Sequence, residues 1–117
     1  MERGFNEAQE ERILKVIGSF TNEKDILDAW ALRIEQSIAF PFQAEIADWQ
    51  EMASIVQEGD VVKVHSIDGI FDMYGIIVNT RYGRKKVAIP LLDLEPINIS
   101  GEQRMLLDDY NVWFSNR

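Results

Sequence analysis

The sequence predicts an α+β fold, in which a small antiparallel SH3-like β-barrel is flanked by N-terminal helices and a C-terminal helix. Three observations predict it. Apolar residues recur at helical spacing in residues 6–39 and again in residues 101–114. Between them, residues 42–97 hold short runs rich in Val and Ile, separated by turns that contain Gly. With 117 residues, the chain is long enough for one domain with a single hydrophobic core.

Two helices are expected before the barrel, and capping residues mark where they begin. The first covers residues 6–17, with Asn6 as a suitable N-cap. The second covers residues 23–39, with Asn22 as its cap. Pro41 ends the second helix, because the residue before a proline is pushed out of the α-helical region.

The middle of the chain is expected to form short strands joined by tight turns. A Gly59-Asp60 turn introduces one strand, and Tyr82-Gly83-Arg84 forms the tip of a hairpin. A corner at residues 90–94 closes the barrel, and closure removes exposed sheet edges. Residues 49–56 fit either a strand or a short helix. The predicted strands cover residues 42–48, 61–67, 75–80 and 86–89.

The last helix is expected over residues 101–114, where Ser100 and Gln103 form a capping box. Its apolar face is strong, so we expect it to pack on the barrel. Helical spacing and a proline junction account for the aromatic residues of the chain as core or near-core residues, not as a platform that stacks on a ligand. These aromatic residues are Trp30, Phe40, Phe42, Tyr110 and Trp113.

Composition and charge narrow the classes of function. The chain has 20 acidic and 12 basic residues, hence a net charge of −8, which repels nucleic acid and anionic membranes and attracts cations. It has no cysteine, which excludes disulfides and thiolate metal sites. No apolar run approaches the length of a membrane span, and the N-terminus lacks an apolar signal core. We therefore expect a soluble cytoplasmic protein.

The charges are unevenly distributed along the chain. Residues 34–62 contain six acidic residues and no Lys or Arg, whereas a predicted hairpin carries four bases, Arg81, Arg84, Lys85 and Lys86. These bases allow two interpretations. They can contact phosphates, as in barrels of nucleic-acid-binding proteins, or they can be a solvated hairpin that protects a sheet edge.

Motifs of known enzyme classes are missing from the sequence, so we expect no enzyme. There is no nucleophile elbow, phosphate-binding loop, zinc-protease motif or dinucleotide fingerprint. The single histidine, His65, lies in the middle of a predicted strand, and without cysteine it offers no familiar zinc set.

Calcium is the cation that suits this chain, because it accepts six to eight oxygen ligands in loose geometry. The sequence has no EF-hand loop. The segment from Asp68 to Asp72 lacks the alternating ligands and the downstream bidentate Glu of such a loop. A calcium site would therefore be assembled from separated segments or be a diffuse charged surface.

Several segments together resemble the family of small acidic calcium-binding proteins of cyanobacterial type (CcbP-like). The most specific is Phe40-Pro41-Phe42, which joins the helix containing Trp30 to a strand. Residues 59–64 (GDVVKV), 87–91 (VAIPL) and 109–114 (DYNVWF) follow in the order and spacing of the family. The resemblance covers residues 24–114 and implies the fold and Ca²⁺ as the ligand. We expect residues 1–117 to form a single domain, with residues 1–20 as a helical extension and residues 21–117 as the family core.

We expect a non-enzymatic protein that sequesters or senses calcium through clustered surface carboxylates. For each expected ligand, the alternative is a solvated surface charge. The expected ligands form three groups: Glu45, Asp48 and Glu51 in the stretch without bases, Asp68 and Asp72 in a loop between two predicted strands, and Asp108 and Asp109 on the last helix.

Two other functions remain open at this point. One is an SH3-like protein-interaction module without metal. The other is a nucleic-acid-associated barrel that uses the hairpin from Arg81 to Lys86. On the leading interpretation the partners are calcium ions, with a protein partner left open. We expect no nucleic acid and no membrane among the partners, and a monomer or weak oligomer.

Overall fold

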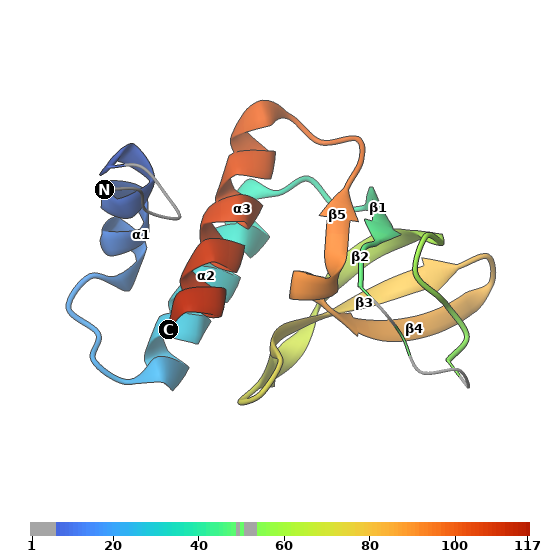
Figure 1. Ribbon diagram of the computed structural model, residues 1–117, viewed down its shortest axis with the longest axis horizontal. Helices are drawn as coiled ribbons and strands as arrows, with labels where there is room; N and C mark the ends of the chain where they lie inside the picture. The colour runs from blue at the N-terminus through green and yellow to red at the C-terminus, as the bar shows by residue number, and fades with distance from the viewer. Residues whose placement is uncertain (1–6, 49, 51–53) are drawn as a thin grey trace.

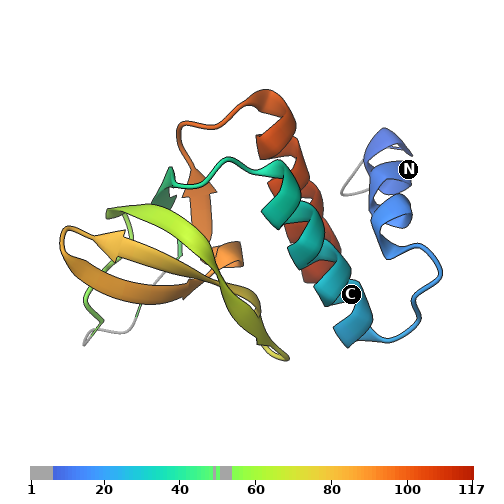
Figure 2. The same ribbon diagram turned by 180° about the vertical axis from the view of Figure 1, so that it is seen from behind.

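The computed structural model describes residues 7–48, 50 and 54–117. Figure 1 shows α1 at one end of the molecule, α2 and α3 in the middle and the sheet at the other end. The view from behind in Figure 2 has the same order. The molecule measures 40 × 27 × 26 Å along its principal axes. In the described residues, no helix has the length and apolar character needed to cross a membrane.

The three predicted helices are confirmed, with small changes at their ends. They are α1 (Glu7–Ile17), α2 (Glu23–Ser37) and α3 (Gly101–Asn116). The Asn22 side chain accepts a hydrogen bond from the Asp25 backbone N–H at 2.8 Å, as expected of an N-cap. The Ser100 hydroxyl accepts one from the Gln103 backbone N–H at 3.2 Å. The predicted cap Asn6 lies outside the described residues.

Helix α2 ends at Ser37, two residues before the predicted end at residue 39. Ile38 already has extended backbone, with φ −94° and ψ 134°, while its N–H still donates to the Ile34 carbonyl at 2.9 Å. The Ile38 side chain is buried in the core. The chain therefore leaves the helix early enough to pack Ile38 before the strand begins at Phe42.

Five antiparallel strands form one sheet in the order β4-β3-β2-β1-β5. Two predicted strands are longer in the structure: the one expected over residues 61–67 continues to Phe71, and the next begins at Gly75 and runs to Tyr82. The strand expected over residues 42–48 stops at Ile46. The bounds are β1 (Phe42–Ile46), β2 (Val61–Phe71), β3 (Gly75–Tyr82), β4 (Lys85–Pro90) and β5 (Leu94–Pro96).

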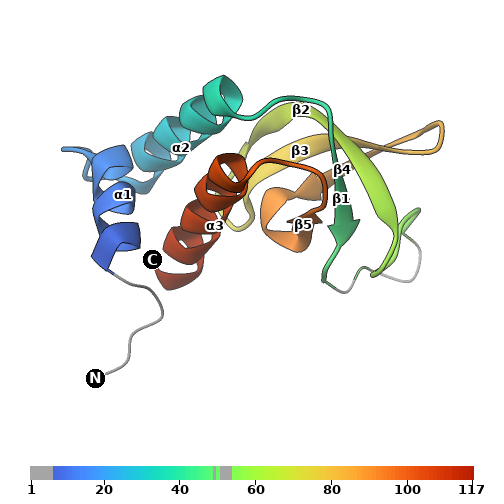
Figure 3. The same ribbon diagram turned by 90° about the horizontal axis from the view of Figure 1, so that it is seen from above.

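The sheet does not close, so the expected SH3-like barrel is not confirmed. Strands β4 and β5 are its two edges, and no pairing joins them in the part of the chain that the structure describes. The predicted corner is the 3₁₀ helix η1 (Leu91–Asp93), and β5 after it has three residues and pairs with β1. Side chains of α2, α3 and η1 join those of the strands in one core. The apolar side chains of the sheet are thus covered without closure. Figure 3 shows α2 and α3 beside the strands.

The aromatic core prediction is confirmed. Trp30, Phe42 and Tyr110 are buried, and Phe40 and Trp113 are partly buried against the same core. The Tyr110 hydroxyl accepts a hydrogen bond from the Ile76 backbone N–H at 2.9 Å, which joins α3 to the start of β3. Helix α3 therefore packs on the sheet, as expected.

Candidate calcium site

Two carboxylates lie side by side where β1 pairs with β5. Glu45 of β1 is in register with Glu95 of β5, and both side chains are exposed. Residues directly opposite on antiparallel strands have Cβ atoms about 5 Å apart, and like charges there repel. Arg104 of α3 offsets one of the two charges, because its guanidinium donates to the Glu95 carboxylate at 2.9 Å. A cation can relieve the repulsion that remains.

Two more carboxylates, those of Asp48 and Asp93, lie near each other just beyond the end of β1. The Ala47 backbone N–H donates to the Asp93 carbonyl at 2.8 Å, which holds η1 against this end of the strand. Gln50 Nε2 donates to the Asp93 carboxylate at 3.4 Å and to the Asp48 carbonyl at 3.3 Å. Partial burial raises the pKa of Asp93, and the nearby Asp48 charge raises it further, although the hydrogen bond from Gln50 acts the other way. The two carboxylates are therefore close enough to affect each other electrostatically.

A third segment reaches the same end of the strand. The Ile46 backbone N–H donates to the Asp60 carbonyl at 2.8 Å, and the Gly59 N–H donates to the Ile46 carbonyl at 2.8 Å. The Asp60 carboxylate accepts from the Gln57 backbone N–H at 2.9 Å and so closes the turn before β2. We name these five carboxylates the β1-end carboxylates: Glu45, Asp48, Asp60, Asp93 and Glu95.

The donor chemistry of the β1-end carboxylates fits calcium, which prefers hard oxygen ligands. The arrangement of the side chains limits how the ion could be bound. In residues 7–48, 50 and 54–117, no three Asp, Glu or His side chains are arranged to hold a metal ion. Calcium held at this end would therefore require rotation of exposed carboxylates or added carbonyl oxygens. The predicted ligand Glu51 lies outside the described residues.

The second predicted group is placed differently from expectation. Asp68 lies within β2, between the paired residues Ile67 and Gly69 where the register with β3 shifts, and not in a loop between strands. Asp72 is in the turn after β2, and its carbonyl oxygen accepts from the Arg117 guanidinium at 3.4 Å. Both side chains are exposed, and among the described residues no group of three acidic or histidine side chains that could hold a metal ion includes them.

The third predicted group is engaged in contacts within the protein. The side chain of Asp109 is 3% exposed and accepts from Arg12 Nε at 2.7 Å and Nη2 at 3.1 Å. Gln9 Nε2 donates to both Asp108, at 3.1 Å, and Asp109, at 3.0 Å. The hydrogen bond to Asp109 also raises the pKa of Arg12. These contacts join α1 to α3 and already balance the Asp109 charge.

Sequence reasoning missed Asp60, Asp93 and Glu95. Asp60 lies in the stretch without bases, whereas Asp93 and Glu95 lie outside it. No local signal identifies Asp93 and Glu95, because Glu95 reaches Glu45 through the pairing of β5 with β1 and Asp93 reaches the end of β1 through the Ala47–Asp93 backbone hydrogen bond. The burial of Asp109 did have a signal. Asp109 follows Leu106 by three residues and precedes Trp113 by four, which places it on the apolar face of its helix.

Comparison with solved structures supports the same fold. The crystal structure of Anabaena CcbP matches with a TM-score of 0.79 at 19% sequence identity, over 98% of this chain and 94% of that chain. A structure described as a calcium binding protein in the calcium-binding form matches with a TM-score of 0.78 at 18% identity, over 95% of this chain and 92% of that chain. At these identities the likeness shows the fold. A comparison with curated proteins gave no match.

The family model described as calcium binding, that of the CcbP proteins, matches residues 11–114. The match includes all five strands, α2, residues 11–17 of α1 and residues 101–114 of α3. It also includes the β1-end carboxylates and both residues of the Arg12–Asp109 pair. Because it spans nearly the whole chain, this protein belongs to the CcbP family of calcium-binding proteins.

Proposed function

We propose that this protein binds Ca²⁺ through the β1-end carboxylates and thereby sequesters or senses the ion. The observation that carries the proposal is the family match over residues 11–114, because the family is one of calcium-binding proteins and not an enzyme class. The relative in its calcium-binding form is consistent with the same ligand. The interaction module without metal and the nucleic-acid-associated barrel are not favoured by these comparisons.

The β1-end carboxylates are better placed for this role than the other acidic groups. They come from three separated segments, which is how a site without an EF-hand must be assembled. Like charges stand opposite each other at Glu45 and Glu95, and the pKa of Asp93 is raised partly by Asp48. A divalent cation replaces this repulsion with attraction. By contrast, Asp109 is already paired with Arg12.

The remaining features of the proposal concern the whole protein. We propose a non-enzymatic, cytoplasmic protein of one domain, monomeric or weakly oligomeric, that does not bind nucleic acid. The net charge of −8 supports the last point, because it opposes the release of counterions that drives non-specific binding to nucleic acid. Glu51 stays a predicted ligand beside Glu45 and Asp48.

Calorimetric titration of the full chain tests the proposal. Chelator-treated protein is titrated with Ca²⁺ in excess Mg²⁺, which dehydrates reluctantly and demands stricter geometry. The variant Glu45→Gln/Asp48→Asn should bind Ca²⁺ at least about tenfold more weakly than wild type. The variant Asp68→Asn/Asp72→Asn, which removes the same charge from β2 and its turn, should stay within about twofold.

Two outcomes contradict different parts of the proposal. If only the Asp68/Asp72 variant weakens binding, calcium binds at the β2–β3 turn and the site is assigned wrongly. If wild type binds no Ca²⁺, the function itself is wrong. The amide NMR spectrum adds a direct map, in which residues next to the β1-end carboxylates should shift most on addition of Ca²⁺.

A further inference from the structure

A cleft of about 480 Å³ lies between the three helices, apart from the β1-end carboxylates. Helix α1 supplies Arg12, Lys15 and Val16, α2 supplies Arg33, and α3 supplies Met105 and Leu106. Pockets that bind small molecules have volumes of about 300–1,000 Å³. The cleft is therefore large enough for a small organic ligand.

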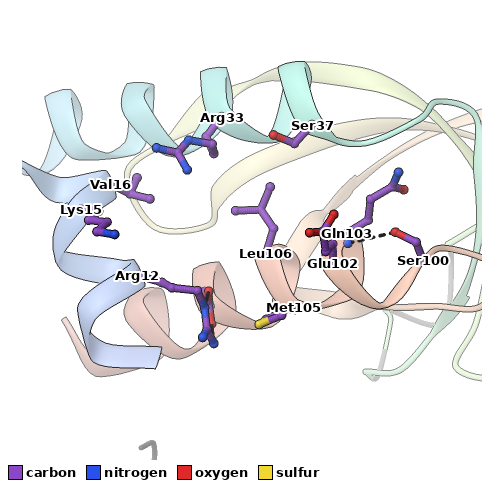
Figure 4. A pocket seen from close by; sticks show the side chains of 11 residues that line it. Arg12, Lys15, Val16, Arg33, Ser37, Ser100, Glu102, Gln103, Met105 and Leu106 are labelled. Carbon is purple, nitrogen blue, oxygen red and sulfur yellow. Dashed lines mark hydrogen bonds and ion pairs between the residues drawn. The ribbon is translucent and has the colours of Figure 1, made fainter. Parts of the chain in front are cut away.

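Two exposed basic side chains line this cleft. Lys15 and Arg33 have no side-chain ion pair or hydrogen bond with any residue that the structure describes. Both residues line the cleft, and Figure 4 shows them on neighbouring helices, Lys15 on α1 and Arg33 on α2. Of the other charged lining residues, Arg12 is paired with Asp109, which leaves Glu102 as the single acid against two bases. The cleft is thus locally positive on a protein whose net charge is −8.

Apolar side chains lie next to the two bases. Leu106 points from α3 into the same gap as Arg33 and Val16 (Figure 4). Met105 is 39% exposed and also lines the cleft, and its flexible thioether adapts to ligands of different shape. A wholly polar ligand would leave these apolar side chains in contact with water. A wholly apolar ligand would remove water from Lys15 and Arg33 without supplying a negative charge.

We propose that the three-helix cleft binds a small organic anion with an apolar body, of the class of medium-chain carboxylates. Arg33 and Lys15 hold the carboxylate, and Val16, Leu106 and Met105 contact the body. The guanidinium of Arg33 presents a planar fork of donors that matches a carboxylate. The site uses no residue of the calcium proposal and stands or falls independently of it.

Titration of the calcium-free full chain with octanoate tests the proposal, with heat and amide NMR shifts as readouts. Octanoate should bind and shift the amides of Lys15, Arg33 and Leu106. Acetate has the charge without the apolar body, and octanol has the body without the charge, so each should bind at least about tenfold more weakly. Equal binding of octanoate and octanol would overturn the role of the two bases, and equal binding of octanoate and acetate would overturn the role of the apolar side chains.

A matched pair of variants separates the site from general charge effects. Arg33→Gln should weaken octanoate binding at least about tenfold, because a hydrogen bond to a charged group is lost. Arg84→Gln removes the same charge at the β3–β4 turn, at the other end of the molecule in Figure 1, and should stay within about twofold. Equal effects of the two variants, or no effect of either, would overturn the proposal. Binding to phosphatidylglycerol vesicles that Arg33→Gln abolishes would reassign the cleft to a lipid headgroup and overturn the free anion.

Discussion

At the scale of single residues, Gly75 and Tyr110 show how closely α3 approaches the sheet. Tyr110 is fully buried, and burial raises its pKa to about 12. Gly75 has a φ of +71°, and a Cβ added there would meet the Tyr110 hydroxyl and the Phe114 ring. Gly75 is therefore required both for its backbone conformation and for the space that it leaves.

Replacing Gly75 with Ala should destabilise the protein more than the same change at a second glycine. Gly83 has a φ of +62° but nothing within 4 Å of an added Cβ, so Gly83→Ala should cost about 1–2 kcal/mol from backbone conformation alone. Gly75→Ala adds overpacking of about 1–3 kcal/mol to a similar conformational cost. Urea unfolding of both variants measures the difference. Equal losses of stability in the two variants would mean that α3 shifts to accommodate the methyl group added at residue 75.

Asp93 supplies a pH-dependent prediction. Burial raises the pKa of Asp93 above the ordinary value of 3.8, so the folded protein favours the protonated carboxyl group more than the unfolded chain does. The stability that protonated Asp93 contributes is present below its pKa in the unfolded chain. That contribution is lost as the pH rises through its pKa in the folded protein. Without calcium at pH 7, Asp93→Asn should have a higher Tm than wild type, and the difference should shrink below about pH 4.

Calcium and an exposed carboxylate provide the controls for Asp93. Asp68→Asn, which removes an exposed charge from β2, should leave the Tm nearly unchanged at both pH values. If Asp93 takes part in calcium binding, Ca²⁺ should raise the Tm of wild type more than that of Asp93→Asn. A lower Tm of Asp93→Asn at pH 7 without calcium would show that the ionised carboxylate stabilises the fold.

At the scale of elements, the contact of α1 with α3 depends on the buried Asp109. Among the described residues, the side chains of Arg12 and Gln9 of α1 donate hydrogen bonds to its carboxylate. Arg12 itself is partly exposed, with 39% of its side chain accessible, so solvent screens part of the interaction. The ion pair therefore orients α1 on α3 more than it strengthens the core.

Replacing Arg12 with Gln should destabilise the protein by about 1–3 kcal/mol, because Asp109 then stays buried with its charge less well compensated. The second change Asp109→Asn should recover part of the loss, which a double-mutant cycle of urea unfolding measures. Lys24→Gln is the control, since it breaks an exposed pair with Asp28 and should cost about 0.5 kcal/mol or less.

The same variant decides whether the third predicted ligand group has a role in calcium binding. If Asp108 and Asp109 are ligands, Arg12 competes with the ion, and Arg12→Gln should bind Ca²⁺ more tightly than wild type. If they only join α1 to α3, the affinity for Ca²⁺ should be unchanged. The β1-end assignment leads us to expect the second outcome.

At the scale of the whole molecule, the excess of acidic residues opposes compactness. At a net charge of −8 the acidic side chains repel one another, and a bound divalent cation removes part of that repulsion. A ligand that binds only the native state raises stability by about 2.7 kcal/mol at a hundredfold excess over its dissociation constant. Ordinary salt also screens surface charge, so a gain in stability is informative only against matched controls.

Millimolar Ca²⁺ should raise the melting temperature more than NaCl of equal ionic strength or Mg²⁺ does. It should also reduce the hydrodynamic radius more than either control. Scanning calorimetry and dynamic light scattering measure the two quantities. Identical responses to the three salts would indicate screening alone and would contradict a specific calcium site.

The helices, most of the strands and the aromatic core were predictable from the amino-acid sequence. These depend on local information: caps such as Asn22 and Ser100, the proline at residue 41, and apolar spacing over one or two turns. The family resemblance was also evident from the sequence, because Phe40-Pro41-Phe42 and the segments at residues 59–64 and 87–91 follow the order and spacing of the family. Apolar periodicity similarly predicted that Trp30 and Tyr110 are buried.

The open sheet and the grouping of the carboxylates depend on contacts between residues that are distant in sequence, so the sequence did not predict them. Strand pairing brings Glu95 opposite Glu45 across 50 positions of sequence, and hydrogen bonds bring Asp93 and Asp60 to the end of β1. Helix packing likewise pairs Asp109, one of the expected ligands, with Arg12. Charge runs along a chain record which residues are neighbours in sequence, whereas repulsion and metal binding depend on distances in space, which non-local contacts set.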